Sequence, residues 1–514
     1  MFDDKAPNSI RSIVIVGGGT AGWMAAALFG KLFDKKYSIT LVESDDIGTI
    51  GVGEATIPAI KTYNSLLGVS EFEVLAATQG TYKLGIEFVD WRRKDHSYIH
   101  SFGKIGRDLL WLRTHQYWRK MFPKGGFQTL EAYAINSVAM RQNRFANPRV
   151  EMDNSPLQDL VAAYHFDAGL FAKFLRGKAE GHGVVRREGR ITHTVLRPDN
   201  GHIDKVVLQS GEEIAGDLFI DCSGMAALLI GKALGVGYHD WGHWLLCDRA
   251  VAVPCESVPT LTPYTRSTAR DAGWQWRIPL QHRTGNGHVY ASRHMSEDEA
   301  TSILMNNLDG APGADPFHVK FTPGRRHKAW VKNCVAIGLS GGFIEPLEST
   351  SIHMIQTSLM RLVHLFPDRS FNPVDIAEYN RRSAFEYEDI RDFIITHYKV
   401  SERDDTRFWR ECLNMEIPDG LRERLELFKA HGRYFRRSNE ELFVEESWIQ
   451  VLIGQGAFDA YDPSVDIVPE EQIAKYLLNI EEVIEKCAAS LPTHNDYIAQ
   501  YCKAPALAKP ALQT

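Results

Sequence analysis

The 514-residue chain contains few cysteines. There are seven, at positions 222, 247, 255, 334, 412, 487 and 502, and no two form a Cys-x-x-Cys pair. Disulfide-stapled domains and structural zinc sites need paired or clustered cysteines. The sequence therefore predicts neither a disulfide framework nor a metal site. Such cysteine usage is typical of the reducing cytoplasm, which is the expected location.

A long apolar run is also absent. Residues 13–30 carry no charge, but this stretch contains five glycines, whereas a membrane span needs about 20 predominantly apolar residues. Residues 1–12 include Asp3 and Asp4 and lack the apolar core of a secretory signal. We therefore expect no membrane span and no signal peptide.

Basic residues are not in excess. The chain has 58 Lys and Arg against 65 Asp and Glu, which gives a formal net charge of −7. A nucleic-acid partner would require a basic surface, so none is expected. Hydrophobic residues (44%) and charged residues (24%) occur in the proportions of a folded globular protein.

The most informative motif follows the first predicted strand, residues 13–16. The segment from Gly17 to Gly22 reads Gly-Gly-Gly-Thr-Ala-Gly and matches G-x-G-x-x-G at the start of a predicted helix, residues 23–33. Gly17 permits the tight turn, Gly19 lets the backbone approach a pyrophosphate, and Gly22 lets the helix pack closely on the strand.

The residues after these glycines complete a dinucleotide site. Thr20 and Ala21 lie just before the predicted helix, whose unpaired N–H groups at its N-terminus favour a phosphate. Glu43 ends the next predicted strand, residues 37–43, and is placed to accept hydrogen bonds from a ribose hydroxyl. The motif alone does not separate NAD from FAD.

A second strand-to-glycine turn favours FAD. The β-rich segment 189–221 ends at Asp221, directly before Cys222-Ser223-Gly224, and a turn of this kind lies against FAD in aromatic-hydroxylase folds. The expected fold class is α/β: an FAD-binding, aromatic-hydroxylase-like flavoprotein module with an inserted mixed β-sheet and a mainly helical C-terminal region. Farther along, residues 82–88 alternate in polarity, which predicts one strand with Lys83 and Glu87 on its polar face.

Three further segments resemble the flavin-dependent tryptophan halogenase family. Residues 51–58 (GVGEATIP) are similar to the family's strap between the flavin and the substrate chamber. Residues 274–279 (WQWRIP) match its W-x-W-x-I-P signature, and residues 346–350 (PLEST) match the segment that carries the catalytic glutamate. Together with the glycine motif, the resemblance extends from Gly17 to about His353.

The resemblance implies an FADH₂-dependent halogenase. Reduced FAD, supplied by a separate flavin reductase, would activate O₂, and bromide or chloride would be oxidised to enclosed hypohalous acid. Lys83 would hold this oxidant by a hydrogen bond or as a haloamine. Glu348 would stabilise or deprotonate the cationic intermediate of an electron-rich aromatic substrate. Judged from the residues alone, Lys83 could instead be a solvated strand lysine, and Glu348 an acid at a helix N-terminus.

The same resemblance assigns further flavin and halide contacts. Gly53, Ala55 and Gly338 would contact the flavin. The N–H groups of Thr350 and Ser351, at the start of a predicted helix, would bind the halide. Better-known members have glycine where Ser351 stands, and we expect bromide to be used at least as well as chloride.

The resemblance also implies that aromatic residues form the chamber walls. Trp274 and Trp276 would keep organic substrate away from the flavin, although most tryptophans are simply core residues. His100, Phe102 and Trp448 would hold an indole or an indole derivative by stacking. The tyrosine pair, glutamate and Phe-Asn by which free-tryptophan halogenases grip the amino acid have no clear copy. Free tryptophan is therefore a doubtful substrate, and a larger indole-bearing or phenolic molecule stays open.

Three regions are expected along the chain. Residues 1–371 form the FAD-binding and halogenation module, which is discontinuous, with substrate-side insertions at about 60–160 and 240–325. Residues 372–502 form a helical substrate-side region that begins with the cap Asn372-Pro373, and residues 503–514 form a disordered tail. Two rival functions remain at this point: an FAD-dependent aromatic monooxygenase that uses NAD(P)H directly, and a flavin-binding redox sensor without catalysis.

Overall fold

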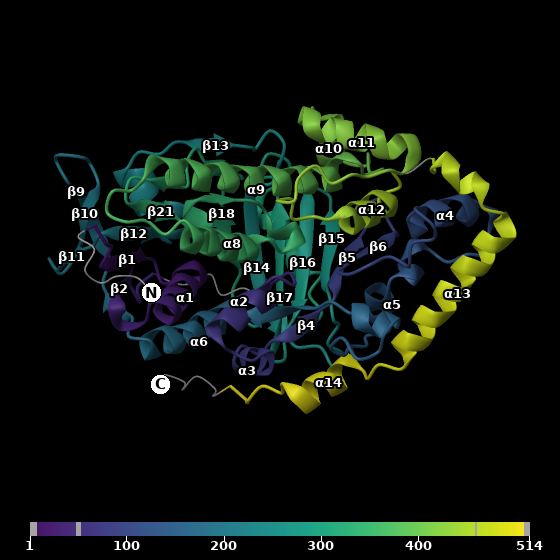
Figure 1. Ribbon diagram of the computed structural model, residues 1–514, viewed down its shortest axis with the longest axis horizontal. Coiled ribbons are helices and arrows are strands. Elements are labelled where there is room, and N and C mark those ends of the chain that lie inside the picture. The colour runs from purple at the N-terminus through teal and green to yellow at the C-terminus, as the bar shows by residue number, and fades with distance from the viewer. Residues whose placement is uncertain (1–7, 48–52, 458–459, 508–514) are drawn as a thin grey trace.

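The computed structural model describes residues 8–47, 53–457 and 460–507. A six-stranded sheet, ordered β20-β21-β12-β1-β2-β8, forms one end of the molecule (Figure 1). Its strands are β1 (Ser12–Val16), β2 (Ser38–Glu43), β8 (Val185–Glu188), β12 (Leu218–Asp221), β20 (Trp330–Val331) and β21 (Cys334–Ala336). All neighbours are parallel except β20 and β21. Because Val16 pairs with both Val42 and Asp221, three strands end at the same edge.

Helices cover this sheet. The helix α1 (Thr20–Phe33) packs against α6 (Ala168–Gly181) and also contacts α8 (Ser351–His364). The β-branched run before the glycines, the Ala-rich helix and the following strand are all confirmed, with the helix starting at Thr20, earlier than predicted.

A seven-stranded sheet stands beside the parallel sheet and is the predicted mixed insertion (Figure 1). In spatial order its strands are β18 (Phe317–Lys320), β14 (Arg249–Glu256), β17 (Arg283–Tyr290), β16 (Gly273–Pro279), β15 (Thr265–Arg270), β5 (Gly85–Val89) and β6 (Ser97–Ser101). Only the β15–β5 pair is parallel among these neighbours. Every residue of β16, which carries both predicted wall tryptophans, is buried.

Three small sheets complete the β-structure. They contain β3 (Gly53–Ala55), β7 (Ala163–Asp167) and β4 (Thr81–Lys83); β9 (Ile191–Leu196), β10 (Ile203–Leu208) and β11 (Glu213–Ala215); and β13 (Tyr238–Asp240), β19 (Gly324–Arg326) and β22 (Gly342–Phe343). Shorter helices between the sheets are α2 (Ile60–Leu67), α3 (Glu71–Ala77), α4 (Thr114–Met121), α5 (Ile135–Arg141) and α7 (Glu297–Met305).

The prediction of one strand over residues 82–88 is wrong. The chain leaves the small β3-β7-β4 sheet after Lys83 and enters the seven-stranded sheet at Gly85. Between them, the N–H of Leu84 donates to the carbonyl of Pro263 instead of continuing a ladder. Period-two alternation cannot reveal this change of sheet, because polar and apolar residues alternate in the sequence through residue 84 without interruption. The polar face assigned to Lys83 is also wrong, since this residue is fully buried.

The C-terminal region is helical, as predicted. It contains α9 (Pro373–Lys399), α10 (Arg407–Asn414), α11 (Asp419–His431), α12 (Glu445–Gly454), α13 (Glu470–Ala489) and α14 (His494–Tyr501). Asn372 caps α9 by accepting a hydrogen bond from the N–H of Val374, with Pro373 at the first helical position. In Figure 1, α13 follows the right-hand edge of the molecule and α14 its lower edge.

The helical region shares its core with the sheets. Trp274 of β16, Ile394 of α9 and Trp448 of α12 belong to one hydrophobic cluster. The predicted boundary at residues 371 and 372 falls between the helices α8 and α9, and residues from both sides of it share one hydrophobic cluster. Whether it also marks a domain boundary stays a prediction.

The chain after α14 is anchored at its beginning. The N–H of Ala504 donates to Gln281, and Gln79 donates to the carbonyl of Pro505, at 2.8 and 2.7 Å. The structure thus gives residues 504 and 505 fixed contacts, residues 508–514 lie outside the described part, and the disordered tail over 503–514 stays a prediction. The composition of an Ala/Pro-rich segment cannot predict such contacts, because they join its backbone to residues that are distant in the sequence.

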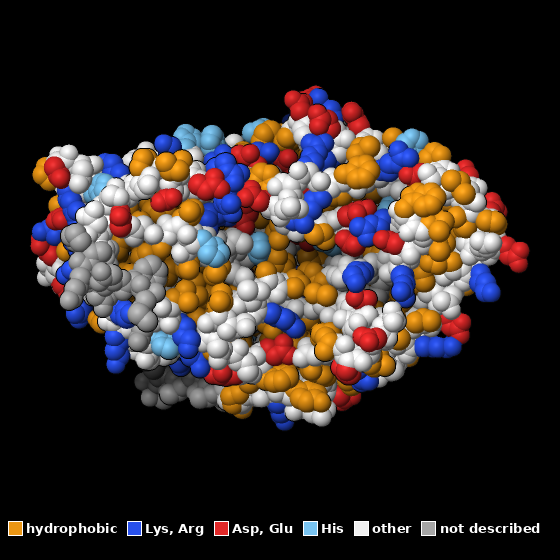
Figure 2. Space-filling view, viewed as in Figure 1, with side chains coloured by type: hydrophobic (Ala, Val, Ile, Leu, Met, Phe, Trp, Pro, Cys, Tyr) orange, Lys and Arg blue, Asp and Glu red, His pale blue; other side chains and the backbone are white. Residues whose placement is uncertain are grey.

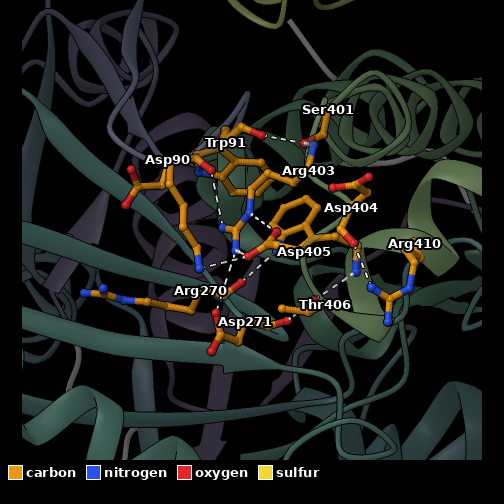
Figure 3. A network of polar contacts seen from close by, with 12 residues as sticks. Asp90, Trp91, Arg270, Asp271, Ser401, Arg403, Asp404, Asp405, Thr406 and Arg410 are labelled. Atoms are coloured by element: carbon orange, nitrogen blue, oxygen red, sulfur yellow. Dashed lines mark hydrogen bonds and ion pairs between the residues drawn. The ribbon is translucent and has the colours of Figure 1, made fainter.

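A polar network around Arg403 fixes the loop that follows α9 (Figure 3). Nε and Nη2 of Arg403 donate to the two carboxylate oxygens of Asp405, each at 2.9 Å. The hydroxyl of Ser401 donates to the carbonyl of Trp91 at 2.6 Å. These contacts stabilise the loop after α9 and connect it to Trp91, which lies just beyond the end of β5.

Acidic and basic side chains are interspersed over the face shown in Figure 2, with hydrophobic groups exposed between them. Within residues 8–47, 53–457 and 460–507, no helix is both long enough and apolar enough to cross a bilayer.

Candidate active site

The glycine loop after β1 forms a tight backbone cradle. Gly17 has φ +110°, and a Cβ at this position would lie 2.2 Å from the carbonyl oxygen of Cys222. A Cβ at Gly22 would lie 1.8 Å from the carbonyl oxygen of Gly17, so α1 can pack this closely only without a side chain. At Gly19, by contrast, a Cβ would meet nothing within 4 Å, and the backbone there faces open space. This geometry fits a bound pyrophosphate.

The open space is a chamber of about 750 Å³. Its lining includes nearly all of the residues predicted to contact FAD: Gly17, Gly19, Thr20, Ala21, Glu43, Gly53, Ala55 and Gly338. Gly22 serves the packing of α1 instead. Two strap residues, Gly51 and Val52, lie outside the described residues. The chamber thus combines a phosphate cradle at one end with aromatic and aliphatic walls, which fits a dinucleotide with a flat ring system.

Glu43 is positioned by an ion pair. Nε of Arg186, on the neighbouring strand β8, lies 2.6 Å from Oε1 of Glu43. The other oxygen lies beside the glycine loop, where a Cβ at Gly18 would come within 1.4 Å of it. Arg186 therefore fixes the carboxylate while Oε2 stays close to the nucleotide cradle, as the predicted ribose contact requires.

Lys83 lies in the interior, at the end of β4. Its Nζ donates to the hydroxyl of Ser349 at 2.8 Å and to the carbonyl of Thr56 in the strap at 3.1 Å, and it lies 5.4 Å from the ring centre of Phe102. Burial lowers the pKa of Lys83 to about 7, although the charge of Glu348 opposes this shift. A substantial fraction of the side chain is therefore a neutral amine near pH 7.

Glu348 lies within a cage of two imidazoles. Nδ1 of His100 is 3.0 Å from both carboxylate oxygens, and Nε2 of His397 is 2.8 Å from Oε1. Burial alone would raise the pKa of Glu348, but the two histidines outweigh it and hold the pKa at about 2. Glu348 is therefore an interior carboxylate that stays ionised, in contrast to an acid at an exposed helix end.

Ser349 connects the chamber with these two residues. It follows Glu348 directly, accepts the hydrogen bond of Lys83, and lines the chamber. Its φ of +59° is in the left-handed region, which is uncommon for a residue with a side chain. This conformation turns the chain between the short 3₁₀ turn at Pro346–Glu348 and α8, so that residues 348 and 349 face different neighbours.

The predicted halide residues begin α8. Thr350 is the N-cap and Ser351 the first helical residue, and Ser351 lines the chamber. Helix geometry leaves the first N–H groups unpaired. The hydroxyl of Thr350 is buried and has no hydrogen-bond partner among the described residues. An anion would find donors here, and the halide role stays a prediction.

The two wall tryptophans are fixed by different means. The ring of Trp276 lies over Gly287 of β17, where a Cβ would come within 2.0 Å of Cη2. The indole N–H of Trp274 donates to Oε2 of Glu345 at 2.9 Å. Both rings line the chamber, and their centres lie 6.1 Å apart.

The substrate residues separate into two groups. His100 contacts Glu348 and Phe102 lies beside Lys83, so the structure brings both to the predicted catalytic pair. Trp448 is buried; its ring centre lies 5.3 Å from that of Tyr434, which is stacked on it, and 4.9 Å from that of Phe393, which is T-shaped to it. A substrate could stack on Trp448 only if one of these rings moved, and its predicted role stays a prediction.

Three residues of the site were missed at the level of sequence. Glu54 of the strap lines the chamber, and burial raises its pKa to about 7. Glu345 holds Trp274, and burial likewise raises its pKa to about 7. His397 continues the helical spacing of Ile390 and Ile394 on α9, so the polar residue in an otherwise apolar stripe was the available signal.

Comparison with known proteins agrees with this geometry. A family model described as tryptophan halogenase matches residues 12–470. Tryptophan 7-halogenase RebH from Lentzea aerocolonigenes is 39% identical over 532 residues, covering 96% of this chain and 98% of the relative. Among solved structures, a flavin-dependent halogenase from Xanthomonas campestris is 48% identical with a TM-score of 0.93, covering 97% of this chain and 100% of its own. BrvH, a flavin-dependent halogenase from Brevundimonas sp. BAL3, is 45% identical with a TM-score of 0.92, covering 98% and 100%. The chain therefore belongs to the tryptophan halogenase family of flavin-dependent halogenases.

Proposed function

We propose that this protein halogenates neutral indole or a neutral indole derivative, and that Lys83 and Glu348 direct the hypohalous acid onto one carbon. As a family member it is an FADH₂-dependent halogenase that uses chloride or bromide as co-substrate and relies on a separate flavin reductase. The observation that carries the site assignment is the burial of Lys83 and Glu348 around one turn, with Ser349 between them. The aromatic monooxygenase alternative is not favoured by the family match.

The flavin end of the site would be held by the glycine loop and the start of α1, with Glu43 at the ribose. The chemistry supplied there by bound reduced FAD is the activation of O₂ and the oxidation of halide to hypohalous acid. The start of α8 would supply the halide with N–H donors at Thr350 and Ser351.

Lys83 would receive the oxidant at the far side of Ser349. A neutral amine can react with hypohalous acid to form an N–halogen bond and water, and an ammonium can donate a hydrogen bond to its oxygen. The lowered pKa of Lys83, about 7, keeps both forms populated near neutral pH. Phe102 at 5.4 Å closes one side of this position, which limits the access of water.

Glu348 would act on the substrate ring. Electrophilic attack leaves a cationic intermediate, and a buried carboxylate stabilises such a charge strongly because no water screens it. With a pKa of about 2, Glu348 is a weak base, so its principal contribution is electrostatic. His100 and His397 would hold the carboxylate in place. The cationic ring, a much stronger acid than the carboxyl group of Glu348, would transfer its proton to this carboxylate as the C–H electron pair restores the aromatic ring.

The substrate preference rests on the charges around Trp448. The buried carboxylate of Glu441 accepts hydrogen bonds from Arg424 at 2.6 Å, from Tyr434 at 3.2 Å and from the N–H of Arg437 at 3.0 Å. Its charge is already compensated, so the ammonium of an amino acid would have to displace Arg424. A neutral indole requires no such exchange.

A substrate series tests this preference. We expect kcat/KM for indole to exceed that for L-tryptophan by about tenfold or more, the cost of leaving one buried charge without a partner. Tryptamine and indole-3-propionate, which each keep one charge, identify the group that is rejected. Equal or higher kcat/KM for L-tryptophan would show that the amino acid is gripped by residues other than Glu441.

The partner and the location are also part of the proposal. The flavin reductase would supply FADH₂ by diffusion or transient contact, and nucleic acid and membrane are not expected partners, in line with the net charge of −7. All seven cysteines are free, which supports a reducing compartment such as the cytoplasm.

A further inference from the structure

We propose that Glu345 is a positioning residue for halogenation: its side-chain oxygen fixes the indole ring of Trp274 in the wall of the flavin chamber. This inference rests on the proposed role of Trp274 in that wall. Glu345 lies three residues before Glu348, in the same turn, but serves the opposite side of the site.

Two hydrogen-bond donors share one carboxylate oxygen of Glu345. Nε1 of Trp274 donates to Oε2 of Glu345 at 2.9 Å, and the hydroxyl of Tyr398 donates to the same oxygen at 3.0 Å. Glu345 is only 1% exposed. Its other oxygen, Oε1, is buried and has no hydrogen-bond partner in the described part of the chain. Oε2 of Glu345 therefore accepts both hydrogen bonds, one from Trp274 and one from Tyr398 of α9.

The comparison with Trp276 shows why Trp274 needs this acceptor. Trp276 is held by shape, since its ring fills the space over Gly287, and its N–H has no partner among the described residues. Trp274 lies opposite Ala269 of β15 and Val289 of β17, so neither neighbouring strand places a glycine opposite it to define the plane of its ring. The hydrogen bond to Glu345 defines it instead. Losing that acceptor leaves a buried indole N–H unpaired.

The groups around Glu345 indicate that the position of its acceptor oxygen, more than its negative charge, holds Trp274 in place. The titratable groups that face Glu345 are Tyr398 of α9, Cys247 in the segment before β14 and Cys412 of α10. None of them is a cation, and burial raises the pKa of Glu345 to about 7. The side chains of protonated glutamic acid and of glutamine each carry a carbonyl oxygen that can accept a hydrogen bond, and the two side chains have the same length. Glutamine should therefore replace Glu345, whereas aspartate, one methylene shorter, should not.

The contact also couples both sides of the site through α9. The consecutive residues His397 and Tyr398 approach Glu348 and Glu345, respectively. The turn from 345 to 348 is thus held at both ends by one helix. Displacement of Glu345 would loosen Trp274 on the flavin side while the contacts of Glu348 are retained.

The decisive experiment uses the full-length protein with 5-fluorotryptophan at its eleven tryptophans and records ¹⁹F NMR spectra. The variant Trp274→Phe identifies the signal of Trp274. We expect the chemical shift of that signal to change by less than its line width in Glu345→Gln. In Glu345→Asp and Glu345→Leu we expect the signal to shift or broaden. An unmoved signal in Glu345→Leu, or equal shifts in the Gln and Asp variants, would overturn the proposal. If Glu345→Leu does not fold, the comparison of Gln with Asp decides.

A second readout connects the position of Trp274 with the reaction. The yield of halogenated indole per FADH₂ oxidised should fall by about tenfold in Glu345→Asp, the effect of one lost buried hydrogen bond, and stay within twofold in Glu345→Gln. In the double variant Glu345→Asp, Trp274→Phe, the losses should not add, because both act through the same ring. Full additivity would contradict the proposal. Absence of any halogenated indole from the unmodified protein would instead refute the proposed substrate, and the NMR comparison would still stand.

Discussion

The ammonium group of Lys83 lies 2.8 Å from the hydroxyl of Ser349, the residue that directly follows Glu348. Lys83 comes from the end of β4 and Ser349 from the turn before α8, so two distant segments meet at this hydrogen bond. Ser349 also lines the flavin chamber. The hydrogen bond thereby joins the lysine to a residue that lines the chamber and directly follows the caged carboxylate, as the proposed path of the oxidant requires.

The buried lysine predicts a pH-dependent stability. Its pKa is about 7 in the folded protein and about 10.4 in an unfolded chain, so the unfolded state binds more protons between these values. The free energy of unfolding should therefore rise as pH increases from 7 to 9, by about 2 kcal/mol at most from this group. Lys83→Met removes the titrating amine. Urea unfolding at pH 7 and pH 9 should show that the variant exceeds the unmodified protein in free energy of unfolding by less at pH 9 than at pH 7. A constant difference between variant and unmodified protein would mean that the pKa of Lys83 is not lowered.

Glu348→Gln should reduce halogenation by about 100-fold or more, because a neutral amide cannot stabilise the cationic ring. Oxidised FAD should bind with unchanged affinity, measured by quenching of flavin fluorescence, since Glu348 is not part of the glycine loop. Glu378→Gln is a matched control at a surface carboxylate that pairs with Arg381 and Arg382, and it should retain full activity. Retained activity in Glu348→Gln would remove this residue from the mechanism.

Gly287→Ala should displace the ring of Trp276. The added Cβ would lie 2.0 Å from that ring, and overpacking of this kind typically destabilises by about 1–3 kcal/mol. We expect a lower melting temperature and weaker FAD binding. Gly177→Ala in α6 is the matched control, because a Cβ there meets nothing within 4 Å, and it should stabilise by about 0.5–1 kcal/mol. Unchanged FAD binding in Gly287→Ala would show that the position of Trp276 is not critical for the chamber.

The halide preference can be measured by competition. Ser351 carries a side chain at the start of α8, where we expect bromide to be used at least as well as chloride. With both halides at equal concentration, mass spectrometry should find at least as much brominated as chlorinated product. The variant Ser351→Gly should shift the ratio toward chloride. A predominance of chlorinated product in the unmodified protein would contradict the expectation.

The local parts of the fold could be predicted from the sequence. The strand, glycine loop, helix and second strand of the nucleotide site follow from hydrophobic periodicity and from glycines at positions that tolerate no Cβ, such as Gly17 and Gly22. The cap of α9 by Asn372 was equally local. Lys83 and Glu348 were found through motif resemblance, and only the structure shows that Lys83 contacts the turn that carries Glu348 and Ser349.

What could not be predicted depends on contacts between distant segments. The break after Lys83 is caused by Pro263, which lies far away in the sequence and takes the hydrogen bond of Leu84. His397 lies on α9, about 50 residues after Glu348, and contacts that carboxylate only through the tertiary packing of α9. Glu345 has no pattern of its own, since its function depends on the indole of Trp274 across the core.

The most direct test of the account is a halide titration with FAD, a flavin reductase, O₂ and indole, comparing the unmodified protein with Lys83→Ala. We expect halogenated indole to appear only with bromide or chloride present, and Lys83→Ala to lose it by about 100-fold or more while FAD binding persists. Lys178→Ala, at a surface ion pair with Glu73, should match the unmodified protein. Halogenated indole from Lys83→Ala at the unmodified rate, or hydroxylated indole formed without halide, would contradict the account.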